Sequence, residues 1–271
     1  MNYRCPIATI ITPAYKKSDM IFQTIDSIVS QTYPNIEYII VDDGPNAIDQ
    51  ECVRKYILNK KSNIVSLKII KNVKNIGIAA SLNKGILKSN GKYIFNVADD
   101  DCLYDSNVIF DWVNEFESTD ADIITAKRAT YSSDMTTFLK IEPNDKVIDH
   151  IKYDSVEDLF EFMNGCNYIF GSVTAKTKKL LESFPYDEEY KLIEDYSSIM
   201  KLLRMGYNIH FFNRIVVKYR LGGISYAQNI SKLYLKESNK LFINEILPYS
   251  KYKIKAIKNY IAWRRNIAKS K

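Results

Sequence analysis

Three consecutive aspartates, Asp99, Asp100 and Asp101, follow the apolar segment 93–98, which is typical of a buried strand. Three carboxylates gathered at a strand end repel one another, and burying them is costly unless a cation binds there. Mg²⁺ and Mn²⁺ prefer carboxylate oxygens, and they often bind through one or two carboxylates together with substrate phosphates. The triplet therefore predicts a divalent-metal site, with a solvated acidic turn as the alternative.

Two other strand ends carry groups suited to a nucleotide. Pro13 and Tyr15 follow the first expected strand, and Asp42 and Asp43 follow the second. An aromatic ring can stack on a nucleobase, and a carboxylate can accept hydrogen bonds from a base N–H or a ribose hydroxyl. Because ligands collect at the carboxyl ends of strands in open parallel sheets, we expect these groups and the aspartate triplet to share one site. Tyr15 as a packing aromatic is the alternative.

The elements that would position these residues alternate between strand-like and helix-like patterns, which indicates βαβ units, a mainly parallel sheet and the α/β class. Strands are expected at 8–12, 36–41, 65–70 and 93–98, and helices near 21–29, 47–59 and 77–89. Beyond residue 105 the pattern loosens. Helices are expected there at 108–116, 180–184 and 193–205, strands at 122–128 and 209–219, and an irregular stretch at 132–149.

The composition is that of an ordinary globular protein. Of 271 residues, 46% are hydrophobic and 26% are charged, which is sufficient for a sizeable core. The four cysteines are far apart and form no metal-binding or redox pair, and two histidines are too few for a histidine metal cluster. No apolar stretch approaches the roughly 20 residues that cross a bilayer. No signal peptide is apparent either, so a cytoplasmic location is expected.

The net charge of +6 is concentrated at the C-terminus. Residues 249–271 contain eight lysines and arginines and no acid, so the rest of the chain is close to neutral. Isoleucines and aromatic residues are interleaved with these bases, a composition suited to an anionic membrane surface. A terminal helix that packs on the domain is an equal alternative. Nucleic acid is not expected as a partner, because no nucleic-acid-binding motif accompanies the charge.

Two familiar nucleotide motifs, Gly-x-Gly-x-x-Gly and Gly-x4-Gly-Lys-Ser/Thr, are absent from the sequence. A phosphate cradled by a glycine-rich loop, as in dehydrogenases and P-loop ATPases, is therefore not expected. A metal bridge to the phosphates is the natural substitute.

Several segments resemble family 2 glycosyltransferases. The segments 12–15, 27–33 and 39–44 are similar to the opening of that family, and the segments 75–79, 83–86 and 91–94 are similar to the stretch that leads to its Asp-x-Asp metal motif. Glu194-Asp195-Tyr196, with Tyr219-Arg220 downstream, resembles its late acidic motif and closing segment. The resemblance spans residues 7 to 225 and is most specific through residue 104.

The resemblance implies a GT-A fold, in which a Rossmann-like nucleotide-sugar-binding half, 1–105, is fused to an acceptor-binding half, 106–225, with a basic helical extension at 226–271. It implies inverting transfer of a sugar from a nucleoside diphosphate sugar, with a UDP-sugar favoured, to a hydroxyl of a glycan or lipid-linked glycan. Bacterial surface polysaccharide synthesis at the inner face of the membrane is the expected setting. The Gln-x-x-Arg-Trp motif of processive synthases is absent, so one sugar per acceptor is expected.

Residue roles also follow from the resemblance. Asp195 would be the general base, with Glu194 as the neighbouring candidate, and Asp100 would be the principal ligand of Mn²⁺ or Mg²⁺, supported by Asp101. Asp99 would support the metal or contact the ribose, because Ala98 stands where the family often has an aspartate. The remaining donor-site residues would be Pro13, Tyr15, Asp42, Asp43, Asn75, Gly77 and Asn83.

Three alternatives stay open. Asp195 could be a surface acid at the start of a helix, where the helix dipole favours negative charge. The chain could be a non-catalytic glycan-binding or scaffolding subunit, although a protein without turnover has no physical reason to keep uncompensated acids. A nucleotidyltransferase is less favoured, because its glycine- and lysine-rich N-terminal loop is missing.

Overall fold

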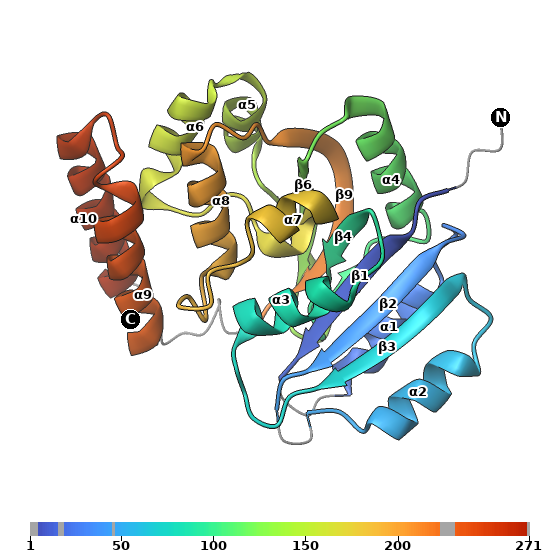
Figure 1. Cartoon of the computed structure of the whole chain (residues 1–271). Helices are drawn as coiled ribbons and strands as arrows, with labels where there is room; N and C mark the ends of the chain where they lie inside the picture. The colour runs from blue at the N-terminus through green and yellow to red at the C-terminus, as the bar shows by residue number, and fades with distance from the viewer. Residues whose placement is uncertain (1–4, 16–18, 45–46, 223–230, 270–271) are drawn as a thin grey trace.

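A mixed sheet forms the centre of the molecule (Figure 1). The computed structural model describes residues 5–15, 19–44, 47–222 and 231–269. Across the sheet the strands follow the order β3-β2-β1-β4-β8-β6-β9-β5, and β7 pairs with β6. The strands are β1 Ala8–Ala14, β2 Ile36–Asp42, β3 Ile64–Lys71, β4 Tyr93–Asn96, β5 Cys102–Leu103, β6 Ile123–Tyr131, β7 Phe138–Glu142, β8 Thr174–Thr177 and β9 His210–Arg220.

The first four strands and their helices form the predicted βαβ units. The connecting helices are α1 (Met20–Val29), α2 (Gln50–Leu58) and α3 (Ile78–Lys88). Strand β1 runs parallel to β2 and β4, and β2 runs parallel to β3. Every residue of β2 is buried, as expected of a parallel strand whose two faces are both covered by helices.

Successive residues of these strands pack against different layers, because side chains alternate across a sheet. Ile11 and Ile39 pack in a cluster that includes residues of α3 and of α7 (Lys178–Ser183). Ile10 and Ile40 pack in the larger core with residues of α1 and of α4 (Val108–Thr119). In Figure 1, α3 and α7 accordingly lie on the near side of the sheet. The core therefore sits on both faces of the sheet.

Strand β8 connects the two halves of the molecule. It pairs antiparallel with β4 of the first half and with β6 of the second, and β6 runs parallel to β9. No strand was expected at 174–177, because four residues are too few to show a period. The sheet is continuous across the predicted boundary at 105. The predicted boundary at 225 lies outside the described residues, so the three-part division stays a prediction.

The expectation of an irregular stretch at 132–149 is wrong. Residues Phe138–Glu142 form β7, and Asp145–Tyr153 form α5, capped by the side chain of Asn144 on the backbone N–H of Val147. A further unexpected helix, α6 (Val156–Phe162), is capped by Ser155. Strand β7 pairs with one neighbour, and its apolar side chains remain exposed. Its sequence therefore shows no alternation of polar and apolar residues from which a strand could be predicted.

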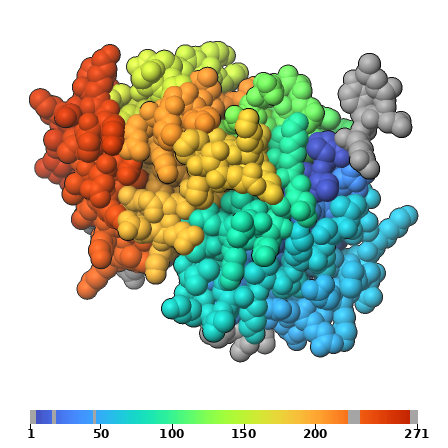
Figure 2. All heavy atoms as spheres, in the orientation of Figure 1, coloured from blue at the N-terminus to red at the C-terminus, as the bar shows by residue number. Residues whose placement is uncertain are grey.

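The C-terminal extension is helical, as expected. Helix α9 (Lys232–Leu241) runs into a π-helical turn (Phe242–Ile246), and α10 (Lys253–Lys269) follows. The ring of Tyr260 stacks on Phe242 with centroids 4.1 Å apart, and Ala256 is buried. Both helices form one flank of the molecule (Figures 1 and 2). One face of α10 therefore packs on the domain. Within the described ranges, no helix combines the length and apolar character needed to span a bilayer.

Candidate functional site

A cavity of about 460 Å³ lies between the carboxyl ends of β1 and β4 and the start of α8 (Glu194–Arg204). Its lining includes four of the predicted site residues, Pro13, Asp101, Glu194 and Asp195. They come from both halves of the chain. Asp101, which follows β4, and the acid pair that begins α8 therefore face one cavity.

The aspartate triplet forms a tight turn after β4. Asp99 and Asp100 are half-buried, and Asp101 is buried. Burial, and then the charge of Asp100, raises the pKa of Asp99 to about 7 and that of Asp101 to about 8. A backbone hydrogen bond from Tyr15 opposes the shift at Asp99. The turn thus holds carboxylates that repel one another, which is the condition a bound cation would relieve.

The donor set of this turn fits a hard divalent cation. All three side chains offer carboxylate oxygens, the ligands that Mg²⁺ and Mn²⁺ prefer. One Asp101 oxygen already accepts the backbone N–H of Arg220 at 2.9 Å. In the part of the chain that the structure describes, no cluster of three or more histidine, cysteine or acidic residues forms a complete metal cage. The fit is therefore to a cation that takes one or two carboxylates here and its other ligands from a substrate.

Arg220, at the end of β9, secures this turn. Its Nε donates to the carbonyl oxygen of Asp100 at 2.8 Å, and its Nη1 donates to the carbonyl oxygen of Ser133 at 2.7 Å. Its Nη2 donates to Oε1 of Gln23 at 2.6 Å. One guanidinium thus joins three segments at the aspartate turn.

Asp43 is buried and hydrogen-bonded within the protein. It accepts from Nδ2 of Asn72 at 3.0 Å and from the backbone N–H groups of Ile76 at 2.8 Å and Gly77 at 3.0 Å. Asn75 also accepts from the Gly77 N–H, at 2.8 Å, and Gly77 has φ +92°, which favours glycine. Asp43 therefore shapes the loop that begins α3.

Asp42 is buried, whereas Tyr15 is exposed. One oxygen of Asp42 accepts from Gln50 at 3.1 Å, while Oδ1 is buried with no hydrogen-bond partner in the described ranges. A buried carboxylate oxygen without a donor is costly, so it marks a place where a bound donor group would be favourable. The side chain of Tyr15 is 43% exposed, which suits stacking on a ligand.

Asn83 is not among the residues that line the cavity, although its neighbour Leu82 and its partner Tyr186 are. Its side chain is bonded to the backbone of Tyr186, donating to the carbonyl at 2.9 Å and accepting from the N–H at 3.0 Å. It also donates to Glu188 at 3.0 Å. Asn83 therefore ties α3 to the segment that follows α7, and the structure does not bring it together with the acids.

Asp195 is held in place by three hydrogen bonds. Its Oδ2 accepts from Nδ2 of Asn167 and from the N–H of Gly171, each at 3.0 Å, and its Oδ1 accepts from the N–H of Tyr196 at 2.6 Å. Burial raises the pKa of Asp195, and these bonds oppose that shift. A carboxylate bound in this way inside a cavity is not a solvated helix-start acid, so the structure disfavours that alternative.

Glu194 lines the same cavity beside Asp195. Burial, and then the charge of Asp195, raises the pKa of Glu194 to about 8. Two neighbouring acids in one cavity share protons, and the one with more hydrogen-bond donors keeps its charge more readily. The geometry thus favours Asp195 as the ionised member of the pair.

Several residues of the cavity were not predicted. Arg128 is ion-paired to Glu142 at 3.1 Å, and its guanidinium lies between the rings of Phe170 and Tyr219, 3.6 and 3.9 Å from their centroids. Six aromatic residues line the cavity: Tyr168, Phe170, Tyr186, Tyr196, Tyr219 and Tyr234. The high tyrosine content, 20 in the chain, was the one available signal for this lining.

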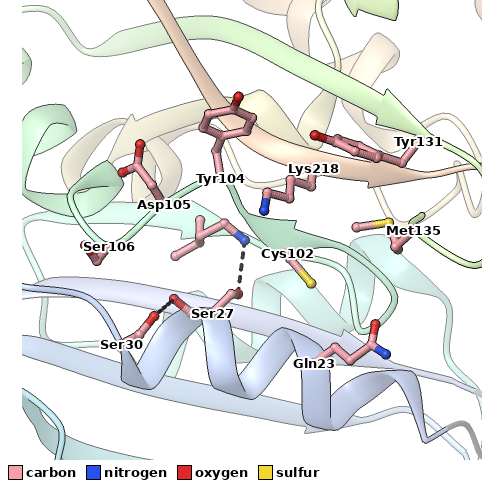
Figure 3. A pocket seen from close by; sticks show the side chains of 11 residues that line it. Gln23, Ser27, Ser30, Cys102, Tyr104, Asp105, Ser106, Tyr131, Met135 and Lys218 are labelled. Carbon is pink, nitrogen blue, oxygen red and sulfur yellow. Dashed lines mark hydrogen bonds between the residues drawn. The ribbon is translucent and has the colours of Figure 1, made fainter. Parts of the chain in front are cut away.

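A second cleft of about 380 Å³ lies beside α1, β5 and β9 (Figure 3). Its lining is mixed: Gln23, Ser27 and Lys218 are polar, while Leu103 and Met135 are apolar. The N–H of Leu103 donates to Ser27 Oγ at 3.0 Å, which closes its floor (Figure 3). Asp101 lines the larger cavity, and Cys102, the next residue and the first of β5, lines this cleft. The start of β5 therefore lies between the two.

A family model described as glycosyl transferase family 2 matches residues 9–174. An uncharacterised glycosyltransferase of Rickettsia felis is 26% identical over 252 residues, which is 91% of this chain and 40% of the relative. TuaG of Bacillus subtilis, a glycosyltransferase named for teichuronic acid biosynthesis, is 22% identical over 83% of this chain and 82% of its own length. The chain spans less than two thirds of the first curated relatives it matches.

Solved structures share the fold. TarS of S. aureus, residues 1–349 in complex with UDP, superposes with a TM-score of 0.67 at 16% identity, over 95% of this chain and 70% of that one. The mannosyltransferase PcManGT of Pyrobaculum calidifontis, in complex with GDP-Man and Mn²⁺, gives a TM-score of 0.63 at 16% identity, over all of this chain and 77% of that one. These likenesses confirm the predicted arrangement of the sheet and its helices.

Proposed function

The chain belongs to glycosyltransferase family 2 and has the GT-A fold, and on that premise we propose that it is a metal-dependent, inverting, non-processive enzyme. It would move one sugar from a UDP-sugar to a hydroxyl of a glycan or lipid-linked glycan. The observation that carries this proposal is the shared cavity: Asp101 from the nucleotide half and Asp195 from the acceptor half line it together.

We assign the general base to Asp195. Its three hydrogen bonds fix the carboxylate and stabilise its charge, so it can take the proton of an acceptor hydroxyl as that oxygen attacks the donor sugar. A positioned base of this kind contributes about 10²–10⁴-fold to a rate. Glu194 keeps its proton and limits the negative charge in the cavity. Attack from the side opposite the leaving group inverts the anomeric centre.

The aspartate turn would hold the leaving diphosphate through a cation. Asp100, supported by Asp101, would bind Mn²⁺ or Mg²⁺, and Asp99 would support the metal or contact the ribose. One Asp101 oxygen is already bonded to the N–H of Arg220. Bound there, a divalent cation would stabilise the negative charge that develops on the leaving group. Arg220 keeps the turn in shape through the Asp100 carbonyl.

The nucleoside would lie over the ends of β1 and β2. Pro13 and the exposed Tyr15 offer the flat surface for a base, with Asp42 and Asp43 at the adjoining end of β2. Asp43, Asn75 and Gly77 form the loop beside them. We propose UDP because the TarS structure contains UDP, while the GDP-Man of PcManGT makes GDP the nucleotide to compare.

The acceptor would be a carbohydrate. The aromatic lining around Asp195 suits the apolar faces of pyranose rings, which stack on such side chains. The name of TuaG links one relative to teichuronic acid synthesis, and we propose surface polysaccharide synthesis as the setting. The exposed isoleucines and the lysines of α10 would place the enzyme at the inner face of the membrane.

Calorimetric titration with UDP and with GDP, each with and without Mn²⁺, tests the donor site. Metal-dependent UDP binding that is lost in Asp100→Ala and retained in Asp195→Asn is the expected result. Glu182→Gln, an exposed acid on α7, is the matched control. Failure of both nucleotides to bind in the presence of Mn²⁺ contradicts the proposal and favours a scaffolding subunit.

A further inference from the structure

Lys176 is a buried cation next to the acid pair. It lies in β8, between β4 and β6, and is 3% exposed. Its Nζ donates to Oγ of Ser198 at 3.0 Å and to Oη of Tyr186 at 3.3 Å, and the Tyr186 ring lies 4.5 Å from it. Lysines are almost never fully buried unless they are paired. Among the ion pairs of the described residues, none involves Lys176.

The opposite charges that act on Lys176 belong to the first turn of α8. Ser198, which accepts from Lys176, follows Asp195 by three residues and Glu194 by four, so it lies on the same face of the helix. Burial lowers the pKa of Lys176 to about 8, and the charges of Asp195 and Glu194 oppose that shift. In return, the charge of Lys176 opposes the upward shift of pKa at both acids.

Other charged and titratable groups around the cluster do not replace this cation. Glu237 of α9 faces Glu194 and adds negative charge, but its carboxylate is engaged by the N–H groups of Lys191 and Leu192. The phenols of Tyr186 and Tyr234 interact with the acid pair in their neutral form, and their pKa values are raised by burial. With Glu194 protonated, one negative charge on Asp195 and one positive charge on Lys176 leave the cluster neutral.

We propose that Lys176 is a positioning residue for the transfer reaction: it is the buried countercharge that keeps Asp195 ionised. This inference rests on the proposed role of Asp195 as the general base. Lys176 does not line the cavity, so it acts through Asp195 rather than on a substrate. Without it, the acid pair would retain a further proton near neutral pH, and Asp195 would lose the site that must receive the acceptor proton.

The pH dependence of unfolding tests the countercharge without any substrate. Urea denaturation at pH 5.5 and pH 7.0, both below the pKa of about 8 of Lys176, would compare the wild type with Lys176→Met, Glu194→Gln and the double variant. We expect the loss of unfolding free energy in Lys176→Met to be larger at pH 7.0, because the folded variant then retains an acid proton that its unfolded chain has already lost. This loss should grow less with pH when Glu194→Gln is present. If the loss of unfolding free energy is equal at both pH values, with and without Glu194→Gln, the effect of Lys176→Met is one of packing alone, and the proposal is overturned.

Two variants separate charge from packing. Lys176→Gln keeps a donor toward Ser198 without the charge. Its free energy of unfolding should depend on pH in the same way as that of Lys176→Met. If Lys176→Met does not fold, Lys176→Gln takes its place in the test. Lys178→Met removes a lysine two residues along, whose Nζ donates to the carbonyl of Ser89. The change in unfolding free energy that Lys178→Met causes should be the same at both pH values.

The activity profile then connects the charge to the reaction. In Lys176→Met the rising limb of kcat against pH should move to higher pH by one unit or more, while KM for the donor stays within about twofold. An unmoved limb with a uniform loss of kcat would overturn the positioning role. If the wild type transfers no sugar, the proposed function fails, and the urea measurements still report whether Lys176 is the countercharge.

Discussion

The backbone N–H of Arg220 donates to Oδ1 of Asp101 at 2.9 Å, across 119 positions of sequence. Arg220 ends the last strand of the sheet, and Asp101 ends the turn after β4. The same arginine then uses its side chain on Asp100, Ser133 and Gln23. One residue therefore links the aspartate turn to the loop after β6 and to α1, which also lines the second cleft.

Replacing Arg220 with Met should loosen the aspartate turn. Acceptors in Asp100, Ser133 and Gln23 lose a charged donor, so the free energy of unfolding should fall by about 1–3 kcal/mol. Metal-dependent UDP binding should weaken at least tenfold, because Asp100 is no longer held through its carbonyl. Urea denaturation and calorimetry measure the two effects.

Arg214→Met is the matched control for that experiment. Arg214 lies on the same strand but pairs with the exposed Asp105 and with Asp111, away from the aspartate turn. It should change stability by about 0–1 kcal/mol and leave UDP binding intact. Equal UDP binding by Arg220→Met and the wild type would contradict the role given to Arg220.

The raised pKa of Glu194 makes stability depend on pH. Below its ordinary value of 4.5, Glu194 is protonated in both the folded and the unfolded chain. Between 4.5 and about 8 the unfolded chain loses this proton and the folded chain keeps it, so the free energy of unfolding falls as pH rises, by a few kcal/mol in total. Glu194→Gln should flatten the decline, as urea denaturation from pH 5 to pH 9 would reveal. Glu182→Gln should keep the wild-type slope, and an identical slope in Glu194→Gln would refute this account.

The strand ends and the acid pair could be predicted because their signals are local. Apolar runs that stop at Pro13, at Asp42 and at Asp99 mark three strand ends within a few residues each. A parallel sheet then brings those ends to one edge, whatever the details of packing. The helix that starts at Glu194 has a comparable local pattern.

The supporting residues could not be predicted, because contacts between distant segments decide their roles. Asn167 reaches Asp195 across 28 positions, and Lys176 reaches Ser198 across 22. Neither pair has a sequence pattern of its own. The same reason applies to the contacts of Asn83, whose side chain is bonded to Tyr186, 103 positions away; its donor-site role stays a prediction.

Asn83→Ala distinguishes a structural role from a donor-binding role. The variant leaves the N–H and carbonyl of Tyr186 without their partner, so the free energy of unfolding should fall by about 1–3 kcal/mol. UDP affinity should stay within about twofold, because the side chain of Asn83 is engaged by the backbone of Tyr186 and by Glu188. Calorimetry at a temperature where the variant is fully folded provides the measurement. A loss of UDP affinity beyond tenfold in the folded variant would restore Asn83 to the donor site.

The outer face of α10 should bind anionic bilayers. Ile254, Ile257 and Ile261 are 73%, 40% and 44% exposed, and their spacing places them in one stripe among the lysines. Replacing Ile254 and Ile257 with Glu should abolish sedimentation with vesicles that contain phosphatidylglycerol. Salt at about 0.5 M should weaken the binding of the wild type to the same vesicles, because surface charges are largely screened at that ionic strength. Val73→Glu, at a 95% exposed site in the nucleotide half, is the control. Equal sedimentation of all proteins, or none by the wild type, would remove the membrane contact.

Gly171 should be intolerant of even a methyl group. A Cβ there would lie 3.1 Å from Cβ of Asp195, while the Gly171 N–H is one of the donors to that carboxylate. Gly171→Ala should displace the base by a fraction of an ångström and lower kcat about 10- to 100-fold, with UDP affinity unchanged because the aspartate turn is untouched. Ser172→Ala, the next residue of the lining, should keep most of the activity. If Gly171→Ala turned over as fast as Ser172→Ala, the hydrogen bonds around Asp195 would not be setting the position of the base.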